Sequence, residues 1–419
     1  MTIKSAMCGT GVWPVRVGEH GRDAHATEKE HGRDAHATEK EHGRDAHATQ
    51  ICAVVLAAVA MLSVAADAGT VLTGAGWQRG DLALQNAAIQ VGGANVKWDA
   101  VLLMVNSKVP PSAAGEAVHL NNGETWAGKI IEAADGKITI ESPLLGKRTL
   151  DLATLKAVDF VAGLPLPKPA KEGTLYRVRG APVPGTLISI KDDKATVDTA
   201  LGAVPMDKKD ISRYMPAAPK EAPAPAAGDE LTLADGSILY GPVQATAAGL
   251  TLAHPVLGNL TIAPQAWLGF RKRGSSVTWL ADLEPASLQT YPLIRRPADP
   301  PRTEHLRAGD DASAARSVTR LHIWPRTVMA WKLPATSGGK LQFRAAVAMT
   351  EGSRGPARVR LSQGDKMLFD QAVAPGAAEP VIVAFEAQAG VELKLEVDFD
   401  VAVRLPCEVT VDDPHVVGS

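Results

Sequence analysis

A spacing that occurs three times between residues 118 and 271 restricts what this 419-residue chain can fold into. Each copy has a short alternating run, a glycine, a second glycine five positions later, and a Leu-Gly pair 21 or 22 residues after the first glycine. Successive copies are shifted by 57 and 56 residues. The copies contain Gly123, Gly128 and Leu145; Gly180, Gly185 and Leu201; and Gly236, Gly241 and Leu257.

The runs around these glycines predict short strands. Apolar and polar residues alternate over 137–140 and 249–252, which places the apolar side chains on one face of a strand. Asn122-Gly123 and Asp235-Gly236 are hairpin dipeptides. The second glycine lies inside a strand pattern, where glycine marks a bulge or a sharp bend. We therefore expect five short, bent strands in each copy, forming a small half-open or closed barrel, with a weaker unit ahead of them.

This spacing resembles that of SH3-like and Sm-like barrels. Sm-like barrels often bind RNA, and RNA binding requires clustered Lys and Arg with stacking aromatic residues. The chain has a net charge of −2 and only 4% aromatic residues, and neither kind is clustered in the repeats. We expect no nucleic-acid partner and assign the barrels a structural or protein-contact role.

The N-terminal residues carry a different repeat. Three near-identical copies of EHGRDAHATEK fill residues 19–49. Their histidines suggest metal binding, but a metal site needs ligands held by an ordered scaffold, and no apolar stripe is present here. We interpret residues 1–50 as a disordered, low-complexity tract. The copies resemble translated intergenic repeats of bacterial gene models, so the true start codon can lie downstream.

An uncharged apolar run over 51–68 ends in Ala66-Asp67-Ala68, which is typical of a signal peptide cleaved after Ala68. The run is short for a membrane-spanning helix, which needs roughly 20 residues. The sequence thus predicts export to the periplasm, the outer cell surface or the medium, and a membrane anchor if cleavage fails. After cleavage, Cys407 is the one cysteine left of three, so no intrachain disulfide can form.

Proline-rich and alanine-rich segments separate the predicted units. The clearest is 216–228, PAAPKEAPAPAAG, which cannot form a core and should be extended. The predicted organisation is a disordered segment (1–50), a signal peptide (51–68), a degenerate small β unit (69–108), three small β-barrel repeats (116–162, 173–215 and 229–273) and a β-sandwich (276–417).

The C-terminal part has longer alternating runs. In 391–405 all eight odd positions are apolar and most of the others are charged, as expected for a strand, or two strands at a corner, with one buried face. Another alternating run covers 341–349. Further strands are predicted at 319–323, 328–333, 357–362, 366–370, 381–385 and 409–411. The predicted fold class is all-β, with tandem small barrels followed by a jelly-roll β-sandwich.

The order of these segments resembles the NPCBM family of carbohydrate-binding modules. The matching pieces are 279–285 (WLADLEP), 321–333 (LHIWPRTVMAWKL), 343–347 (FRAAV), 359–361 (VRL), 366–370 (KMLFD) and 391–398 (VELKLEVD). The resemblance implies a β-sandwich attached to exported bacterial proteins, with binding of sugars. The chain has Trp324 where the family usually has a histidine, and 404–414 keeps only the Asp-Pro ending of the family's final motif.

A sugar site needs an aromatic face for the ring and planar polar groups for the hydroxyls. Trp324 and Trp331 are the candidate platforms, and Arg320, His322 and Arg326 are the candidate hydrogen-bonding residues. Each can instead be a packed or solvated strand residue. Asp412 and Asp413 could hold a calcium ion, a hard cation that prefers carboxylates, or form a turn before Pro414. No other cofactor is expected.

The sequence predicts an exported, non-catalytic binding protein whose sandwich binds a carbohydrate or another cell-envelope component. The alternative is a structural or protein-interaction protein without sugar binding. An enzyme is not expected, because HExxH, nucleophile-elbow and paired His/Cys patterns are missing from the sequence. Gly74, Gly76 and Gly80 superficially suggest a phosphate loop, but no helical pattern follows them.

Overall fold

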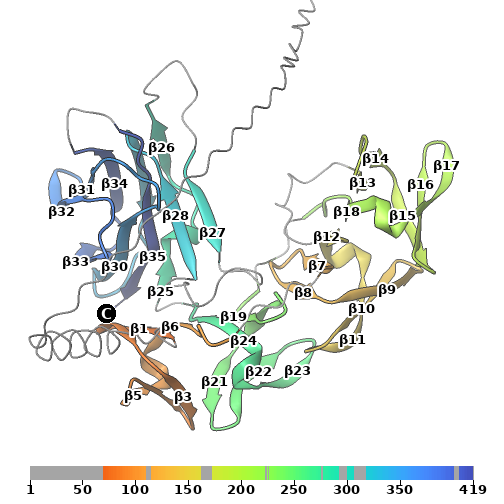
Figure 1. Cartoon of the computed structure of the whole chain (residues 1–419), viewed down its shortest axis with the longest axis horizontal. Helices are drawn as coiled ribbons and strands as arrows, with labels where there is room; N and C mark the ends of the chain where they lie inside the picture. Colours follow the sequence, from red (N-terminus) through yellow and green to blue (C-terminus); the bar gives the residue numbers. More distant parts are fainter. Residues whose placement is uncertain are drawn as a thin grey trace, which may run out of the picture. The chain divides into compact units, whose positions relative to one another are not determined.

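The computed structural model describes residues 69–109, 115–161, 172–221, 224, 226–274, 277–291, 300–305, 318–400 and 405–418. These residues lie in one unit, which runs from Val64 to Ser419. The N-terminal repeats, the predicted signal segment and Ala68 lie outside the described residues. In the described ranges the regular structure consists of strands and short 3-10 turns, which confirms the all-β prediction (Figure 1).

Four repeats with the same order of strands precede the sandwich. Repeat 1 contains β1 (Thr70–Thr73), β2 (Gly76–Arg79), β3 (Leu82–Gln85), β4 (Ala88–Val91), β5 (Ala94–Lys97), η1 (Trp98–Ala100) and β6 (Val101–Val105). Repeat 2 contains β7 (Ala117–Leu120), β8 (Thr125–Ala127), β9 (Lys129–Ala134), β10 (Lys137–Ser142), β11 (Gly146–Asp151), η2 (Leu152–Thr154) and β12 (Leu155–Asp159).

Repeats 3 and 4 follow the same plan. Repeat 3 contains β13 (Thr174–Arg177), β14 (Val183–Pro184), β15 (Thr186–Lys191), β16 (Lys194–Thr199), β17 (Gly202–Asp207), η3 (Lys208–Asp210) and β18 (Ile211–Met215). Repeat 4 contains β19 (Asp229–Leu233), β20 (Ile238–Gly241), β21 (Val243–Thr246), β22 (Gly249–His254), β23 (Gly258–Ile262), η4 (Pro264–Ala266) and β24 (Trp267–Arg271).

Within each repeat the strands divide into two groups. The first strand pairs with the second and the last, and the middle three strands form an antiparallel meander. The second glycine of the sequence pattern lies where the chain passes from one group to the other, so the strand expected there is bent into two pieces. At Gly128 a Cβ atom would lie 2.5 Å from the carbonyl oxygen of Glu141, a distance that only glycine permits. The strands of a repeat form bent sheets that do not close into a barrel.

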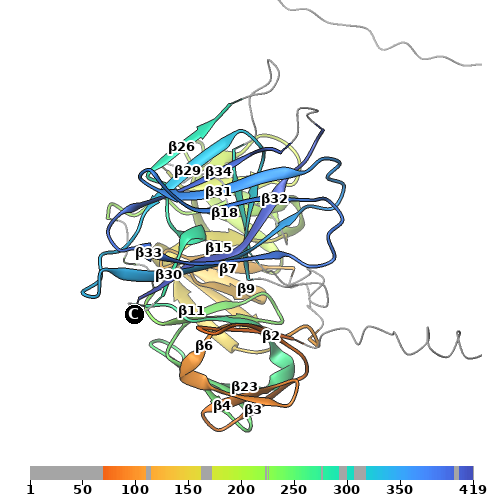
Figure 2. The same cartoon turned by 90° about the vertical axis from the view of Figure 1, so that its left-hand side faces the viewer.

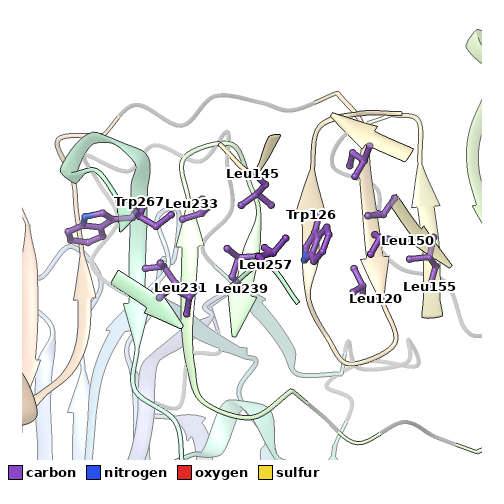
Figure 3. Close-up of a cluster of buried hydrophobic side chains, with 14 of the residues drawn as sticks. Leu120, Trp126, Leu145, Leu150, Leu155, Leu231, Leu233, Leu239, Leu257 and Trp267 are labelled. Atoms are coloured by element: carbon purple, nitrogen blue, oxygen red, sulfur yellow. The ribbon is translucent and has the colours of Figure 1, made fainter. Parts of the chain in front are cut away.

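The first group of strands from every repeat joins one 12-stranded sheet. The order is β14-β13-β18-β12-β7-β8-β20-β19-β24-β6-β1-β2, so the repeats follow one another in space as 3, 2, 4 and 1. A single apolar cluster runs through all four. Figure 3 shows its centre, where Leu145 and Leu257 lie between Leu233 and Trp126. Neighbouring repeats thus share one core, as expected for units too small to bury enough apolar surface alone.

The sandwich consists of two antiparallel sheets. One has the order β27-β28-β35-β30-β33, with β25 also paired to β35, and the other has the order β26-β29-β34-β31-β32. Figure 2 shows β29, β34 and β31 in one layer and β30 and β33 in the other. The elements are β25 (Val277–Trp279), η5 (Leu280–Asp282), β26 (Ser287–Thr290), β27 (Arg302–His305), β28 (Thr319–Ile323), β29 (Thr327–Lys332), β30 (Lys340–Met349), β31 (Ala357–Gln363), β32 (Lys366–Val373), β33 (Val381–Gln388), β34 (Glu392–Phe399) and β35 (Val409–Gly418).

Alternation along these strands fills the space between the sheets. On β34, Leu393, Leu395 and Val397 face the core, and the residues between them face outward. The predicted strand over 391–405 is shorter in the structure, because β34 ends at Phe399 and residues 405–408 are not in a strand. Residues 401–404 lie outside the described ranges.

A buried ion pair network joins the sandwich to repeat 4. Arg271 on β24 donates from Nη2 to Glu230 on β19 at 2.9 Å and to Asp282 in η5 at 2.8 Å. Its Cζ lies 5.3 Å from the centre of the Trp279 ring. Repeat 1 contacts the sandwich as well, through Arg79, whose guanidinium is 2.8 Å from Glu379. The sandwich is therefore packed directly onto the repeats.

Candidate functional site

A pocket of about 290 Å³ opens on the β26-β29-β34 sheet of the sandwich. Strand pairing creates it, because Thr290 is opposite Thr327, and Thr327 is opposite Val397 on the other side. Tyr291, which follows β26, and Arg326, which precedes β29, therefore lie at the same end of the sheet as Asp398 of β34. The lining residues are Tyr291, Arg326, Thr327, Val328, Glu396, Val397 and Asp398.

The rim of the pocket is held by backbone contacts. Arg326 adopts a φ of 65°, which turns the chain back into β29 directly after β28. Its carbonyl oxygen accepts a hydrogen bond of 2.9 Å from the Tyr291 N–H. The Tyr291 side chain is 48% exposed, and its hydroxyl donates to Gln289 Oε1 at 2.6 Å. A half-exposed aromatic side chain is thus held at the rim of the pocket.

Two carboxylates on the outer face of β34 complete the lining. Glu396 is paired with Arg360, whose Nη1 donates to its Oε1 at 2.8 Å. Asp398 Oδ1 accepts a hydrogen bond of 2.8 Å from the Phe399 N–H, and within the described ranges Asp398 forms no ion pair. One carboxylate is therefore neutralised by a neighbour, while the other remains available to a ligand.

The structure brings two of the sequence-predicted residues to this end of the sandwich. Arg326 lines the pocket. Trp324, two residues earlier in the β28–β29 connection, is 37% exposed. These two residues keep the role of ligand-binding candidates.

The other candidates are engaged elsewhere. Trp331 is 2% exposed and belongs to the core between the sheets, so its ring cannot serve as a surface platform. Arg320 donates from Nε to Asp412 Oδ1 at 2.6 Å. His322 is 5% exposed, and its Nε2 is 2.7 Å from Glu304 Oε2. The sequence does not show that Trp331 faces the core. Pro325 interrupts the alternation of apolar and polar residues between Trp324 and Trp331, so the two rings cannot be assigned to a face of the sheet.

The proposed calcium ligands have protein partners. Asp412 is paired with Arg320. Asp413 is fully buried and accepts hydrogen bonds from the N–H of Thr319 at 2.8 Å, from its hydroxyl at 3.1 Å and from the N–H of Val318 at 3.1 Å. These contacts occupy the oxygens that calcium would need. Within the described ranges, no group of three His, Cys, Asp or Glu side chains is arranged to hold a metal ion.

Next to Asp413 lies a buried histidine. His415 Nδ1 is 2.7 Å from the Asp413 carbonyl oxygen, which can only accept, so Nδ1 carries the proton. Its Nε2 is buried and has no hydrogen-bond partner among the residues that the structure describes. Burial, together with the nearby Arg344 charge, lowers the pKa of His415 to about 4. Burial raises the pKa of Asp413 to about 7.

Replacing His415 with asparagine is expected to make the free energy of unfolding less dependent on pH between 6.5 and about 4. The lowered pKa means that the unfolded chain binds more protons than the folded chain between pH 6.5 and about 4. The His415 contribution is therefore complete above pH 6.5 and falls by roughly 2–3 kcal/mol as the pH approaches 4. Asp413 is present in both proteins, so its titration cancels in the comparison. Urea denaturation at a series of pH values measures the difference in the free energy of unfolding between the unchanged chain and His415→Asn. A difference that does not change with pH would contradict the prediction.

Sequence reasoning missed Tyr291, Glu396 and Asp398. Tyr291 precedes Pro292, at the start of a proline-containing segment, 292–301. Glu396 and Asp398 belong to the predicted solvent-facing surface of a strand, but nothing in the strand pattern marks the point where β26 and β29 end beside it. An exposed aromatic residue next to a proline-rich segment was the signal that could have indicated the site.

Parts of the chain are similar to solved structures of carbohydrate-binding modules. No family model matches the chain, and no curated protein does. The CBM51 module of Clostridium perfringens GH95 in complex with methyl-galactose is 13% identical with a TM-score of 0.27, over 34% of this chain and all of that one. The TmCBM61 module in complex with beta-1,4-galactotriose is 12% identical with a TM-score of 0.19, over 29% and 89%.

A third similar structure contains CBM51-2 of Clostridium perfringens ZmpB in complex with GlcNAc. It is 10% identical with a TM-score of 0.27, over 40% of this chain and 36% of that one. The TM-scores of all three are well below 0.5. In the described ranges, no helix combines the length and the apolar character that a membrane crossing requires.

Proposed function

We propose that the protein binds a carbohydrate in the pocket between β26, β29 and β34, without catalysing a reaction on it. The observation that supports this most is the combination of the half-exposed Tyr291 ring, the Arg326 guanidinium group and the Asp398 carboxylate around one concave surface. Asp398 forms no ion pair within the described ranges. The apolar C–H face of a sugar packs on an aromatic ring, and its hydroxyls need planar donors and acceptors.

Each lining residue has a distinct role in this proposal. Tyr291 provides the stacking face, and Trp324 extends it from the preceding connection. Asp398 accepts hydrogen bonds from hydroxyls, and Arg326 donates to hydroxyl or ring oxygens. Ligand pockets usually measure ~300–1,000 Å³, and this one measures about 290 Å³. The proposed ligand is therefore a single sugar ring or the end of a chain.

Alanine at position 291 is expected to weaken sugar binding at least tenfold, about 1.4 kcal/mol, because the stacking face is lost. Asparagine at position 398 is expected to cause a loss of similar size, because a neutral amide accepts hydrogen bonds more weakly than a carboxylate. A glycan array with the full chain identifies the ligand, and isothermal titration of the variants measures the loss.

The matched control is Met367→Ala on β32, a 50% exposed apolar side chain that does not line the pocket. It should leave the affinity unchanged. If Met367→Ala and Tyr291→Ala weaken binding equally, or if both variants of the pocket bind as the unchanged chain does, the sugar is bound elsewhere.

A second candidate function is protein interaction or a structural role without sugar binding. It is favoured by the 12-stranded sheet shared by four repeats and by the engagement of Arg320, His322, Asp412 and Asp413 in contacts within the sandwich. No response on the glycan array from a correctly folded chain would support this candidate.

Export remains part of the proposal. It is supported by the apolar run and the Ala66-Asp67-Ala68 pattern, which lie outside the described residues. Sequencing the N-terminus of the protein recovered from the cell envelope or medium is expected to give Gly69 at the start of the mature chain. A product that begins upstream of residue 51 would contradict cleavage after Ala68.

A further inference from the structure

The contact between repeats 2 and 4 has a local two-fold arrangement. Strand β8 pairs antiparallel with β20, and Thr125 lies opposite Ile238. Each of these residues is the second after the first glycine of its repeat, Gly123 and Gly236. Equivalent positions therefore face each other across the contact, as they do in a symmetric dimer interface.

Two reciprocal hydrogen bonds, each from a backbone N–H to a side chain of the other repeat, extend this pairing. The Ala127 N–H donates to Ser237 Oγ at 3.0 Å, and the Tyr240 N–H donates to Glu124 Oε1 at 3.3 Å. Both donors are the fourth residue after the first glycine, and both acceptors are the first residue after it. The interface thus depends on backbone N–H groups at the fourth position and on side-chain acceptors at the first.

Side chains at the tips of the β10–β11 and β22–β23 hairpins reinforce the contact. Ser142 Oγ donates to Asp235 Oδ2 at 3.0 Å, and His254 Nε2 lies 2.8 Å from Glu124 Oε1. Ser142 and His254 are equivalent residues, because each is four positions before the glycine of its Leu-Gly pair, Gly146 or Gly258. The tip leucines are buried, Leu145 to 4% and Leu257 to 9% exposure. Each tip therefore reaches the glycine turn of the other repeat.

Repeat 3 presents the same edge to solvent, because β14 is the last strand of the 12-stranded sheet. Its first glycine, Gly180, has a φ of 106°, close to the 99° of Gly123 and the 93° of Gly236. The first, second and fourth residues after Gly180 are Ala181, Pro182 and Pro184. The acceptor is missing at the first position, and the two prolines have no N–H to donate.

The side chains at the hairpin tip, and the residue before the first glycine, are nevertheless retained in repeat 3. The tip residue Leu201 is 97% exposed. Asp198 occupies the position of Ser142 and His254, and Arg179 occupies the position of Asp235. In the two-fold arrangement, Asp198 of one repeat 3 would face Arg179 of another, with opposite charges. Neither side chain has an ion-pair partner within the described ranges.

We propose that repeat 3 terminates its end of the row, and that Ala181, Pro182 and Pro184 prevent a second copy of this chain from pairing with β14. Arg179, Asp198 and Leu201 still match such a copy, so the missing acceptor at Ala181 and the missing N–H groups of the two prolines are what exclude it. Proline on an edge strand is a known means of blocking sheet extension. The interface that this edge would otherwise form is an isologous dimer with the geometry of the contact between repeats 2 and 4.

The test is the variant A181S/P182T/P184A in the full chain, which places the counterparts of Ser237, Thr125 and Ala127 in repeat 3. Sedimentation velocity is expected to show a mass twice that of the unchanged chain at the same concentration. Because three changes near a turn can disturb folding, P182T alone is the second variant, with a weaker shift toward the dimer. Circular dichroism confirms that each is folded. A folded variant with the mass of the unchanged chain overturns the proposal.

Charge variants identify the surface. R179E added to the triple variant should abolish the doubled mass, since two carboxylates would then face each other. R179E together with D198R in the same chain should restore it, because the two-fold arrangement pairs them again. Doubling that persists with R179E, or an unchanged chain that already dimerises and is dissociated by R179E, would overturn the proposal.

Discussion

Replacing Arg271 with methionine is expected to lower the free energy of unfolding by about 3–5 kcal/mol. Arg271 is 2% exposed, and methionine fills much of the same space without the charge. The variant leaves Glu230 buried without its cation. Burial pushes the pKa of Glu230 upward, but the Arg271 charge holds it below its usual value, so Arg271 is the main group that keeps the carboxylate ionised.

The loss should also reach the sandwich, because Arg271 holds Asp282 of η5 through two hydrogen bonds, of 3.0 and 2.8 Å. Urea denaturation followed by tryptophan fluorescence measures the change. The double variant R271M/E230Q should recover part of the loss, because the uncompensated charge is removed. Arg358→Met, on the solvent-facing side of β31, is the matched control and should behave as the unchanged chain does. Equal effects of R271M and the control would contradict the role of the network.

The local part of the fold follows from the sequence, whereas the order of the repeats does not. The alternation predicts the strands, and the spacing of Gly123 and Gly128 predicts the turn and the bend in repeat 2, because both depend on residues near in the chain. The spatial order 3, 2, 4 and 1 depends on edges that meet between non-consecutive repeats. Glu124 and His254, which mark one of these meetings, are 130 residues apart.

The site was predictable to a similar extent. The β28–β29 connection with Trp324 and Arg326 can be identified from the sequence, and so can the outward face of β34. Tyr291 and Asp398 join them only through the pairing of β26, β29 and β34, which is a property of the sheet order. Trp331 is a candidate platform in the sequence, but its side chain belongs to the core between the sheets. The alternation does not reveal this, because Pro325 interrupts it in the connection ahead of β29.

Alanine at Gly128 is expected to destabilise the chain by about 4 kcal/mol, at the upper end of single-residue effects. The added Cβ would lie 2.5 Å from the carbonyl oxygen of Glu141 and 2.9 Å from the Cα of Ser142, both backbone atoms. Relief of this overlap requires the bend between β8 and β9 to separate from β10. Ser142 bonds to Asp235, so the contact between repeats 2 and 4 would be strained as well.

Two other glycines separate this steric effect from the general cost of losing a glycine. A Cβ at Gly146 meets nothing within 4 Å, but the φ of 71° is unfavourable for alanine, so G146A should cost only about 1 kcal/mol. A Cβ at Gly115 is free of contacts without a positive φ, so G115A should stay within ~0.5 kcal/mol of the unchanged chain. Thermal and urea denaturation of the three variants should give the order G128A, G146A, G115A. If G128A were no worse than G146A, the close approach of the two backbones at the bend would not be what fixes glycine there, and the second glycine of the repeat would need another explanation.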